Sequence, residues 1–499
     1  MQNFQLPADY VARLVPDYFN DSQFADRDII YQPEVYEAAD YLVRSTGRTT
    51  IIDLGCGCAR KLRTVSGTRH VGVDFGSNIE SCRKQFPQWG EWIEADFSHA
   101  SCMQLAELAD EQAIIICSDV IEHLSDPSHL ASLLKACFER GAIVLTSTPD
   151  RLKLWGADYK GPPPNPSHIR EWALSEYVSY LATEGLPTFW AGYTYNNNID
   201  RRSITILTIH DPGIVMERLQ QRTRPLAILS AFNEGDIIEE VARDWVEQGC
   251  DIHILDNWST DDTYAIATKL QASFPAAITV ERFPAEPTNI YQWEKILRRK
   301  EEIAAACPGR WIIHTDADEI RRAPDGIATI AEGLSIAEAY GSNRVGFNLI
   351  NYRPTTGAPF EPGTLTSAFQ HFEFGSLPGH FIQLKAWLQG AARIDLATSG
   401  GHKAQFDDAR NFPYKFLLKH YPIRSQDHGR RKIFDQRQGR WDPAERARGW
   451  HVQYDQFDPS SSFVWDAGVL QLEGPDFWAE HGYAVMTDAL QSGLRKRDP

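Results

Sequence analysis

Short apolar runs alternate with longer amphipathic segments along this chain, and the alternation occurs twice. In the first half, β-branched and apolar runs predict strands at 49–54, 71–74, 113–117 and 143–149, and another that ends at 94–96. In the second half, the pattern predicts strands at 225–231, 251–256, 277–280 and 311–315, and helices at 236–248 and 289–306. Strands that alternate with helices predict parallel α/β sheets, which bind ligands at the carboxyl ends of their strands. We therefore expect two doubly wound sheets in tandem.

The segments that flank the first set of strands are predicted to complete its fold. Residues 1–46 are predicted to be helical, with an apolar face that covers the first sheet. The aromatic run 189–193 is predicted to be core, and 203–209 is predicted to be a late edge strand that closes this sheet.

The length of 499 residues predicts two or three domains. A turn at 211–213 and the polar stretch 217–224 place a boundary between a domain at 1–215 and a domain at 225–499. With 42% hydrophobic and 23% charged residues, both domains can form ordinary globular cores.

Charge and cysteine usage restrict the partners and the compartment. The formal net charge of -17 repels phosphate backbones, so we expect no nucleic-acid partner. No apolar run reaches the roughly 18 residues of a spanning helix, and no signal peptide is evident, although peripheral membrane contact stays possible. The eight cysteines are scattered without paired C-x-x-C motifs, which favours reduced thiols in a cytoplasmic protein.

The first predicted strand runs directly into a turn with two glycines, Asp53-Leu54-Gly55-Cys56-Gly57. A dinucleotide-binding G-x-G-x-x-G motif needs a third glycine at position 60, which is Arg60. An acidic strand end followed by G-x-G instead resembles the first motif of the class I S-adenosylmethionine-dependent methyltransferases.

Later strand ends of the first half agree with this resemblance. Asp74 ends the second strand, where a carboxylate can accept hydrogen bonds from a ribose diol. The resemblance implies that Asp96 and Phe97 bracket the adenine and that the segment D-V-I-E-H-L, which begins at Asp119, is the loop after the fourth strand. Each of these residues alone could equally cap a helix or occupy a turn. The implied cofactor-binding residues are Asp53, Gly55, Gly57, Asp74, Asp96, Phe97 and Asp119.

A hydroxyl acceptor must lose its proton as it receives the methyl group. His123 is the predicted general base, because an unperturbed imidazole titrates close to neutral pH. His168 is the alternative, and the reaction can also proceed without a base, by positioning the acceptor in line with the methyl group.

In the second half, the predicted strand at 311–315 is followed by Asp316-Ala317-Asp318-Glu319. Two carboxylates one residue apart at a strand end can hold a divalent cation that neutralises a diphosphate. Together with the strand order, these residues resemble the family 2-like glycosyltransferases of the GT-A fold. The resemblance implies a nucleotide-sugar site at Asn233, Glu234, Asp256, Asp316 and Arg424, and a Mn²⁺ or Mg²⁺ site at Asp316, Asp318 and His402. His402 could equally be a turn residue. The segment Asp256-Asn257-Trp258 departs from the commoner family pattern, which leaves the nucleotide base open.

An inverting glycosyltransferase also needs a carboxylate base for the acceptor hydroxyl. Glu373 and Asp395 are the two candidates, and the sequence does not choose between them.

The sequence thus predicts a bifunctional cytoplasmic enzyme that transfers methyl groups from S-adenosylmethionine and sugars from a nucleotide-sugar donor. Its expected acceptor is a glycan or lipid-linked glycan, as in the biosynthesis of a bacterial surface polysaccharide. The alternatives are an enzyme that tailors a small natural product, and a scaffold or binding protein in which one domain is inactive.

Overall fold

The computed structural model describes residues 4–17, 19–21, 29–215, 223–375, 381–452 and 455–487. The chain divides into two compact units. The first contains Met1–Glu217 and also Pro475–Pro499, and the second contains Arg218–Gly474. The C-terminal segment therefore belongs to the first unit, whereas the sequence analysis assigned all of 225–499 to the second.

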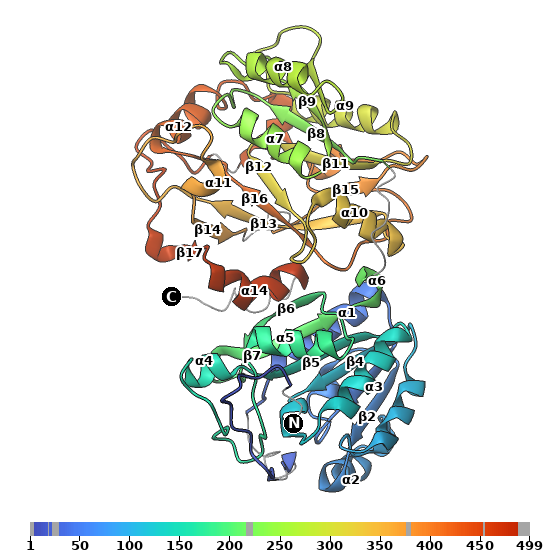
Figure 1. Cartoon of the computed structure of the whole chain (residues 1–499). Coiled ribbons are helices and arrows are strands. Elements are labelled where there is room, and N and C mark those ends of the chain that lie inside the picture. Colours follow the sequence, from blue (N-terminus) through green and yellow to red (C-terminus); the bar gives the residue numbers. More distant parts are fainter. Residues whose placement is uncertain are drawn as a thin grey trace. The chain divides into compact units, whose positions relative to one another are not determined.

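The first unit is built on a seven-stranded sheet in the order β3-β2-β1-β4-β5-β7-β6 (Figure 1). Its first five strands are parallel, and β7 runs antiparallel to both β5 and β6. The strands are β1 Thr50–Leu54, β2 Arg69–Asp74, β3 Glu91–Glu94, β4 Ala113–Ser118, β5 Ile143–Pro149, β6 Trp190–Tyr195 and β7 Ser203–His210. The helices are α1 Pro33–Thr46, α2 Gly76–Gln85, α3 Ser128–Glu139, α4 Arg151–Trp155, α5 Leu174–Thr183, α6 Pro212–Val215 and α14 Pro475–Thr487, with 3-10 turns η2 Leu62–Thr64, η3 Ala100–Leu108 and η4 Ile121–His123.

The central strands β1 and β4 are buried on both faces, as their almost continuous apolar runs require. Ile52 and Leu54 of β1 belong to the core cluster that includes residues of α3 and α5. Side chains alternate along a strand, so Asp53 between them points to the opposite face, where Tyr36 of α1 contacts it.

Two expectations for the first unit were wrong. Among the described residues before Pro33, no α-helix forms, and α1 begins at Pro33. Segment 203–209 is not the sheet edge, because β7 lies between β5 and β6. The aromatic side chains of the run 189–193 are buried, as expected of core residues, and the run supplies most of the edge strand β6. Helix α14 packs against β6 (Figure 1). The ring of Tyr483 contacts that of Trp190.

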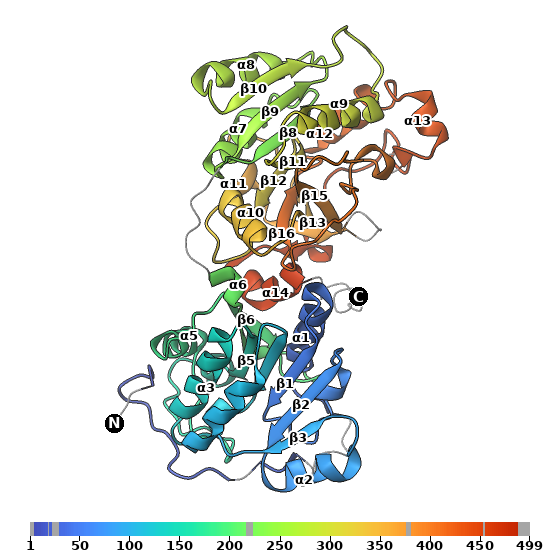
Figure 2. The ribbon, with the colours of Figure 1, turned by 90° about the vertical axis from the view of Figure 1, so that its right-hand side faces the viewer.

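The second unit contains a ten-stranded sheet of mixed direction (Figure 2). Strands β10, β9, β8 and β11 are parallel neighbours, in that order. Beyond β11 the sheet continues with antiparallel β15 and β13, and β16 pairs with both β13 and β12. The doubly wound pattern expected from the sequence therefore describes the parallel half of this sheet alone.

The strands of the second unit are β8 Leu226–Ala231, β9 Asp251–Asp256, β10 Ile278–Arg282, β11 Trp311–Asp316, β12 Glu319–Arg322, β13 Arg344–Tyr352, β14 His371–Phe374, β15 Ile382–Leu388, β16 Phe416–His420 and β17 Gln471–Leu472. Its helices are α7 Ile238–Glu247, α8 Thr263–Ser273, α9 Trp293–Ala305, α10 Ile330–Ala339, α11 Leu365–Ala368, α12 Gln426–Arg430 and α13 Pro443–Ala447, with 3-10 turns η5 Ala397–Ser399 and η8 Ala467–Val469 and a π-helical turn η6 Arg431–Asp435. The predicted helix at 289–306 corresponds to α9, whose Ile296 and Leu297 pack on β8 and β11 in one core cluster.

All eight cysteines lie in the described residues and none forms a disulfide. None of the described helices combines the length and the apolar character needed to cross a bilayer.

Candidate functional site

A cavity of about 550 Å³ opens at the carboxyl ends of the parallel strands of the first unit. The turns after β1, β2, β3 and β4 all contribute to its wall. Of the predicted cofactor-binding residues, those that line it are Gly55, Gly57, Asp74, Asp96, Phe97 and Asp119. Residues of the N-terminal segment, which the sequence assigned to a covering helix, form the facing wall, including Asp17, Phe19, Asp21 and Gln32.

The turn after β1 requires its two glycines. Gly55 has φ +88°, and a Cβ at this position would lie 2.3 Å from Cγ2 of Val120. Gly57 has φ +53°, and a Cβ there would lie 2.5 Å from Oδ2 of Asp21. Both residues keep the main chain open at the cavity wall, where a bound molecule can approach it closely.

Asp74 closes this turn from the neighbouring strand. Its carboxylate accepts hydrogen bonds from the main-chain N–H groups of Gly57 and Phe75, each at 2.8 Å, and from Asn78 Nδ2 at 3.4 Å. Burial raises the pKa of Asp74 to about 6, although these hydrogen bonds oppose the shift.

Asp53 lies behind the cavity wall and outside the lining residues. Its carboxylate accepts from the Tyr36 hydroxyl at 3.2 and 3.1 Å, and its side chain is fully buried. Burial raises the pKa of Asp53 to about 7, and Lys61 and Tyr36 act against that shift. Asp53 therefore joins the end of β1, just before the glycine turn, to helix α1 through Tyr36.

The loop after β4 holds three titratable side chains, of which Asp119 and His123 line the cavity and Glu122 is buried beside it. Asp119 adopts φ +56°, and the turn η4 then positions Glu122 and His123. Burial, and then Asp119, raise the pKa of Glu122 well above its usual range. Burial, and then His168, lower the pKa of His123 to about 4. The ring of His123 is therefore neutral near pH 7.

Hydrogen bonds fix the orientation of both imidazoles. Nδ1 of His123 donates to the main-chain oxygen of Ser167 at 2.7 Å, which leaves Nε2 as the acceptor atom. Nδ1 of His168 contacts Oε1 of Glu171 at 2.6 Å, and Nδ2 of Asn165 donates to its Nε2 at 2.9 Å. The two rings meet edge to face, with their centroids 4.9 Å apart.

Sequence reasoning considered His123 and His168 as rival bases, and the structure brings them together. The sequence analysis did not identify Glu122, Asn165 or Glu171. Glu122 could have been identified, because it lies inside the D-V-I-E-H-L segment. Asn165 and Glu171 flank His168 in the sequence, but their roles depend on a contact between loops that no local pattern reveals.

In the second unit, the loops that follow β8 and β9 are joined by hydrogen bonds. The N–H of Asn233 donates to Ser259 Oγ at 3.0 Å, and Oδ1 of Asn233 accepts from the N–H of Thr260 at 2.7 Å. Asp256 is buried at the end of β9, where it accepts from the N–H of Ser259 and lies 3.5 Å from Arg282. These loops lie at the same edge of the sheet as the end of β11.

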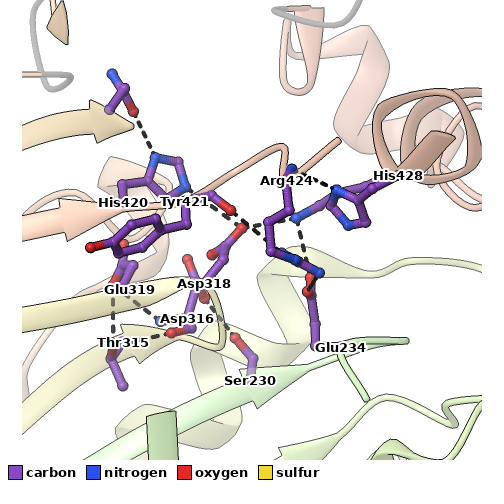
Figure 3. A network of polar contacts seen from close by, with 12 residues as sticks. Ser230, Glu234, Thr315, Asp316, Asp318, Glu319, His420, Tyr421, Arg424 and His428 are labelled. Carbon is purple, nitrogen blue, oxygen red and sulfur yellow. Dashed lines mark hydrogen bonds and ion pairs between the residues drawn. The ribbon is translucent and has the colours of Figure 1, made fainter. Parts of the chain in front are cut away.

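Asp316 and Asp318 lie at that edge as predicted, but each already has polar partners (Figure 3). Asp316 accepts from Ser230 Oγ at 2.7 Å. Asp318 lies 2.8 Å from Nζ of Lys432 and 3.7 Å from Nε2 of His420. Burial alone raises the pKa of Asp318, but Lys432 and His420 bring it well below its usual range.

The predicted metal set Asp316, Asp318 and His402 does not fit a divalent cation in this arrangement. Lys432 supplies the positive charge beside Asp318, and Nδ1 of His402 is hydrogen-bonded to Gln383 at 3.2 Å. Within the described residues, the group of three side chains whose ligand atoms lie close enough to hold a metal ion is in the first unit instead.

The remaining predicted residues of the second unit are also paired. Arg424 is fully buried, and its guanidinium contacts Glu234 at 2.6 Å and Asp236 at 2.8 Å, so it is not presented to a diphosphate (Figure 3). Asp395 lies 3.4 Å from Arg298 and accepts from the N–H of Thr398.

Glu373 pairs with Arg353 at 2.6 Å, and its strand register relates it to residues of β13, β16 and β12. Glu373 is opposite Asn351, Asn351 is opposite His420, and His420 is opposite Glu319. Residues opposite one another on adjacent strands share a face of the sheet, so Glu373 and His420 lie in one row on the same face. His420 in turn contacts Asp318.

Comparison with known proteins shows that the first unit is similar to methyltransferases. The family model of a methyltransferase domain matches residues 2–188. A Mycolicibacterium smegmatis protein named a probable S-adenosylmethionine-dependent methyltransferase is 24% identical over 165 residues. The match covers 32% of this chain and 58% of that relative, so the chain spans less than two thirds of the relative's length.

Solved structures give low similarity over the whole chain. An S-adenosylmethionine-dependent methyltransferase from Mesorhizobium loti is 15% identical, covers 34% of this chain and 92% of its own, and has a TM-score of 0.25. A methyltransferase from Aquifex aeolicus is 14% identical, covers 39% of this chain and 98% of its own, and has a TM-score of 0.28. Scores this low carry no part of the assignment. On the family match, the first unit contains a class I S-adenosylmethionine-dependent methyltransferase domain. The match ends at residue 188 and therefore includes no residue of the second unit.

Proposed function

We propose that the first unit transfers a methyl group from S-adenosylmethionine to a hydroxyl group. The observation that carries this proposal is the cavity at the carboxyl ends of β1 to β4, which gathers the glycine turn, Asp74, Asp96 and Phe97 at one place. Without side chains, Gly55 and Gly57 allow the cofactor to lie against the main chain. Asp74 has carboxylate oxygens for the ribose hydroxyls, and Asp96 and Phe97 form the wall for the adenine.

The cofactor supplies a methyl group bound to a positively charged sulfur. The chain's own residues enclose the two reactants and hold the acceptor oxygen in line with that methyl group. His123 and His168 line the cavity where the hydroxyl proton must leave, which supports an oxygen acceptor over one that has no proton to lose.

Calorimetry with S-adenosylmethionine tests this proposal. We expect one binding event per chain, and at least about a tenfold loss of affinity in Asp74→Ala, since a pair of hydrogen bonds to the ribose is removed. Asp126→Ala is the matched control, because this exposed carboxylate contacts Ser128 and does not line the cavity. Absence of binding to the unaltered protein would leave the scaffold alternative for this unit.

For the second unit we propose sugar transfer from a nucleotide-sugar donor to a glycan or lipid-linked glycan. The supporting observation is the edge of the parallel half-sheet, where Asn233, Asp256 and Asp316 follow neighbouring strands. We propose Glu373 as the base because its strand register aligns it with the row that contains His420. We propose that Lys432 neutralises the charge of Asp318. A bacterial surface polysaccharide is the proposed pathway, and small-molecule tailoring is the alternative.

Hydrolysis of a nucleotide-sugar panel, with and without added Mn²⁺, tests the second proposal. Asp316→Asn is expected to abolish turnover, whereas Asp408→Asn, at an exposed loop, leaves it unchanged. Turnover that depends strictly on Mn²⁺ would contradict the role given to Lys432. An acceptor screen then separates glycans from small aglycones.

A further inference from the structure

Glu122, His123 and His168 form a compact cluster at one side of the methyltransferase cavity. Each offers one ligand atom, and these atoms all lie within 4.8 Å of one another. Glu122 and His123 come from η4, and His168 comes from the loop before α5, so tertiary folding assembles the group. His123 and His168 also line the cavity itself.

Three carboxylate oxygens at this cluster are buried without a hydrogen bond of normal geometry in the described residues. Glu122 is fully buried, and both of its carboxylate oxygens are among the three, although the Thr148 side chain and the Glu122 main-chain N–H lie near enough to lower its pKa. Oδ1 of Asp119 is likewise buried without a partner. A buried carboxylate oxygen that lacks a donor or a cation is costly. A cation bound beside these oxygens would offset that cost.

The imidazoles are held in the way that metal-binding histidines usually are. Glu171 contacts Nδ1 of His168, and the Ser167 carbonyl accepts from Nδ1 of His123. A carboxylate or a carbonyl on one ring nitrogen fixes the ring and makes the other nitrogen a better ligand. In both rings that other nitrogen is Nε2, which at His168 now accepts from Asn165.

We propose that Glu122, His123 and His168, with Asp119 beside them, bind a divalent transition-metal cation at the edge of the cofactor cavity. Two imidazoles with carboxylates favour Mn²⁺, Fe²⁺, Co²⁺ or Zn²⁺ over Mg²⁺ and Ca²⁺, which prefer all-oxygen ligands. The cation replaces the hydrogen bond from Asn165 to His168 and satisfies the buried carboxylate oxygens.

The role of this site in catalysis rests on the proposed methyl transfer. The acceptor oxygen binds the cation, which lowers the pKa of its hydroxyl, and the hydroxyl proton passes to water. The oxygen then attacks the methyl carbon, the carbon–sulfur bond breaks with its electron pair remaining on sulfur, and S-adenosylhomocysteine leaves. His123 acts in this scheme as a ligand of the cation, in place of the general base predicted from sequence.

The full chain, freed of metal with a chelator and transferred to metal-free buffer, is titrated with Co²⁺. Binding is followed by calorimetry and by the visible absorption of the bound ion. We expect one tight site per chain whose spectrum indicates nitrogen ligands, and competition by Mn²⁺ and Zn²⁺. Weak binding of several ions without a visible spectrum would overturn the proposal, because carboxylates on the acidic surface bind cations nonspecifically in this way.

Variants locate the site. Glu122→Gln and His168→Gln keep the side-chain shape approximately and should each weaken Co²⁺ binding by more than about 100-fold, and Glu171→Gln by about 10-fold to 100-fold. His129→Gln on α3, outside the cavity lining, is the matched control and should bind Co²⁺ normally. Each variant must retain its thermal transition, which separates loss of a ligand from loss of the fold.

Failure of this proposal is distinguishable from failure of the proposed function. If the metal-free chain binds S-adenosylmethionine and transfers methyl groups at the full rate, the cation has no role in the reaction, although methyl transfer stands. If Co²⁺ binds with the expected variant pattern but S-adenosylmethionine does not bind, the metal site stands and methyl transfer fails. Equal Co²⁺ affinity in the chain and in Glu122→Gln would show that the ion lies elsewhere.

Discussion

Asp74 is held at the end of β2 by two main-chain amides, and burial raises its pKa to about 6. A ribose diol donates hydrogen bonds and needs the carboxylate in its ionised form. Protonation of Asp74 therefore competes with the cofactor, and affinity should fall as the pH decreases through 6. Between pH 7 and pH 5 we expect a loss of about tenfold, since one pH unit below a pKa leaves about one tenth of the group ionised.

Calorimetric titrations of S-adenosylmethionine across this pH range measure the effect. Asp74→Asn cannot ionise and should bind weakly with a flat profile over the same range. A wild-type profile that is flat from pH 5 to pH 7 would show that Asp74 does not contact the cofactor.

Gly55 allows a second prediction at the scale of one residue. Gly55→Ala places a methyl group 2.3 Å from Val120 and forces alanine to φ +88°. We expect a loss of about 3 kcal/mol of folding free energy and of most cofactor affinity, from left-handed strain together with overpacking. Gly47, with φ +74° and no atom within 4 Å of an added Cβ, isolates the strain, so Gly47→Ala should cost about 1 kcal/mol. Denaturant unfolding followed by circular dichroism compares the two, and equal losses would contradict the clash at Val120.

Among the elements, β12 is fixed to its neighbours through Glu319. Its carboxylate contacts Arg321, Lys385 of β15 at 2.8 Å and the N–H of Asp316 at 3.1 Å, all in a buried environment. Glu319→Gln leaves two buried cations without their partner, which should cost about 3–5 kcal/mol. In Glu91→Gln, the exposed pair with Arg69 is lost at a cost below about 1 kcal/mol. Thermal unfolding measures both, and a mild effect at Glu319 would mean that water enters this network.

The parallel strands were predictable from sequence because their apolar runs are short, continuous and β-branched, as in β1 and β4. The position of β6 was not, because its aromatic composition fits a core segment equally well, and its place at the edge depends on β7. The six lining residues of the cofactor set follow from strand ends, whereas Asp53 faces α1 because side chains alternate along β1. The oppositely charged partners Lys432 of Asp318 and Glu234 of Arg424 lie more than a hundred residues away in the sequence, and no local pattern contains them.

At the scale of the whole molecule, the chain leaves the first unit, builds the second and returns. Helix α14 packs on the edge strand β6, where Phe477, Tyr483 and Val485 are buried. The first unit is therefore discontinuous in sequence. The boundary predicted from composition near residue 220 agrees with the first domain boundary, and the second boundary, between Gly474 and Pro475, was not predicted.

This return predicts how the two units respond to a deletion. Removal of residues 475–499 exposes β6 and loses several buried apolar side chains, each worth about 1.5–3 kcal/mol. The free energy of unfolding of the first unit should decrease by at least about 3 kcal/mol. The free energy of unfolding of the second unit, which ends at Gly474, should not change. Calorimetric scanning, with S-adenosylmethionine added to identify the first unit's transition, measures both. Glu480→Gln, which removes only the surface pair with Lys153, is the control and should shift neither transition by more than about 1 kcal/mol. An unchanged first transition after the deletion would mean that β6 is stable as an edge without α14.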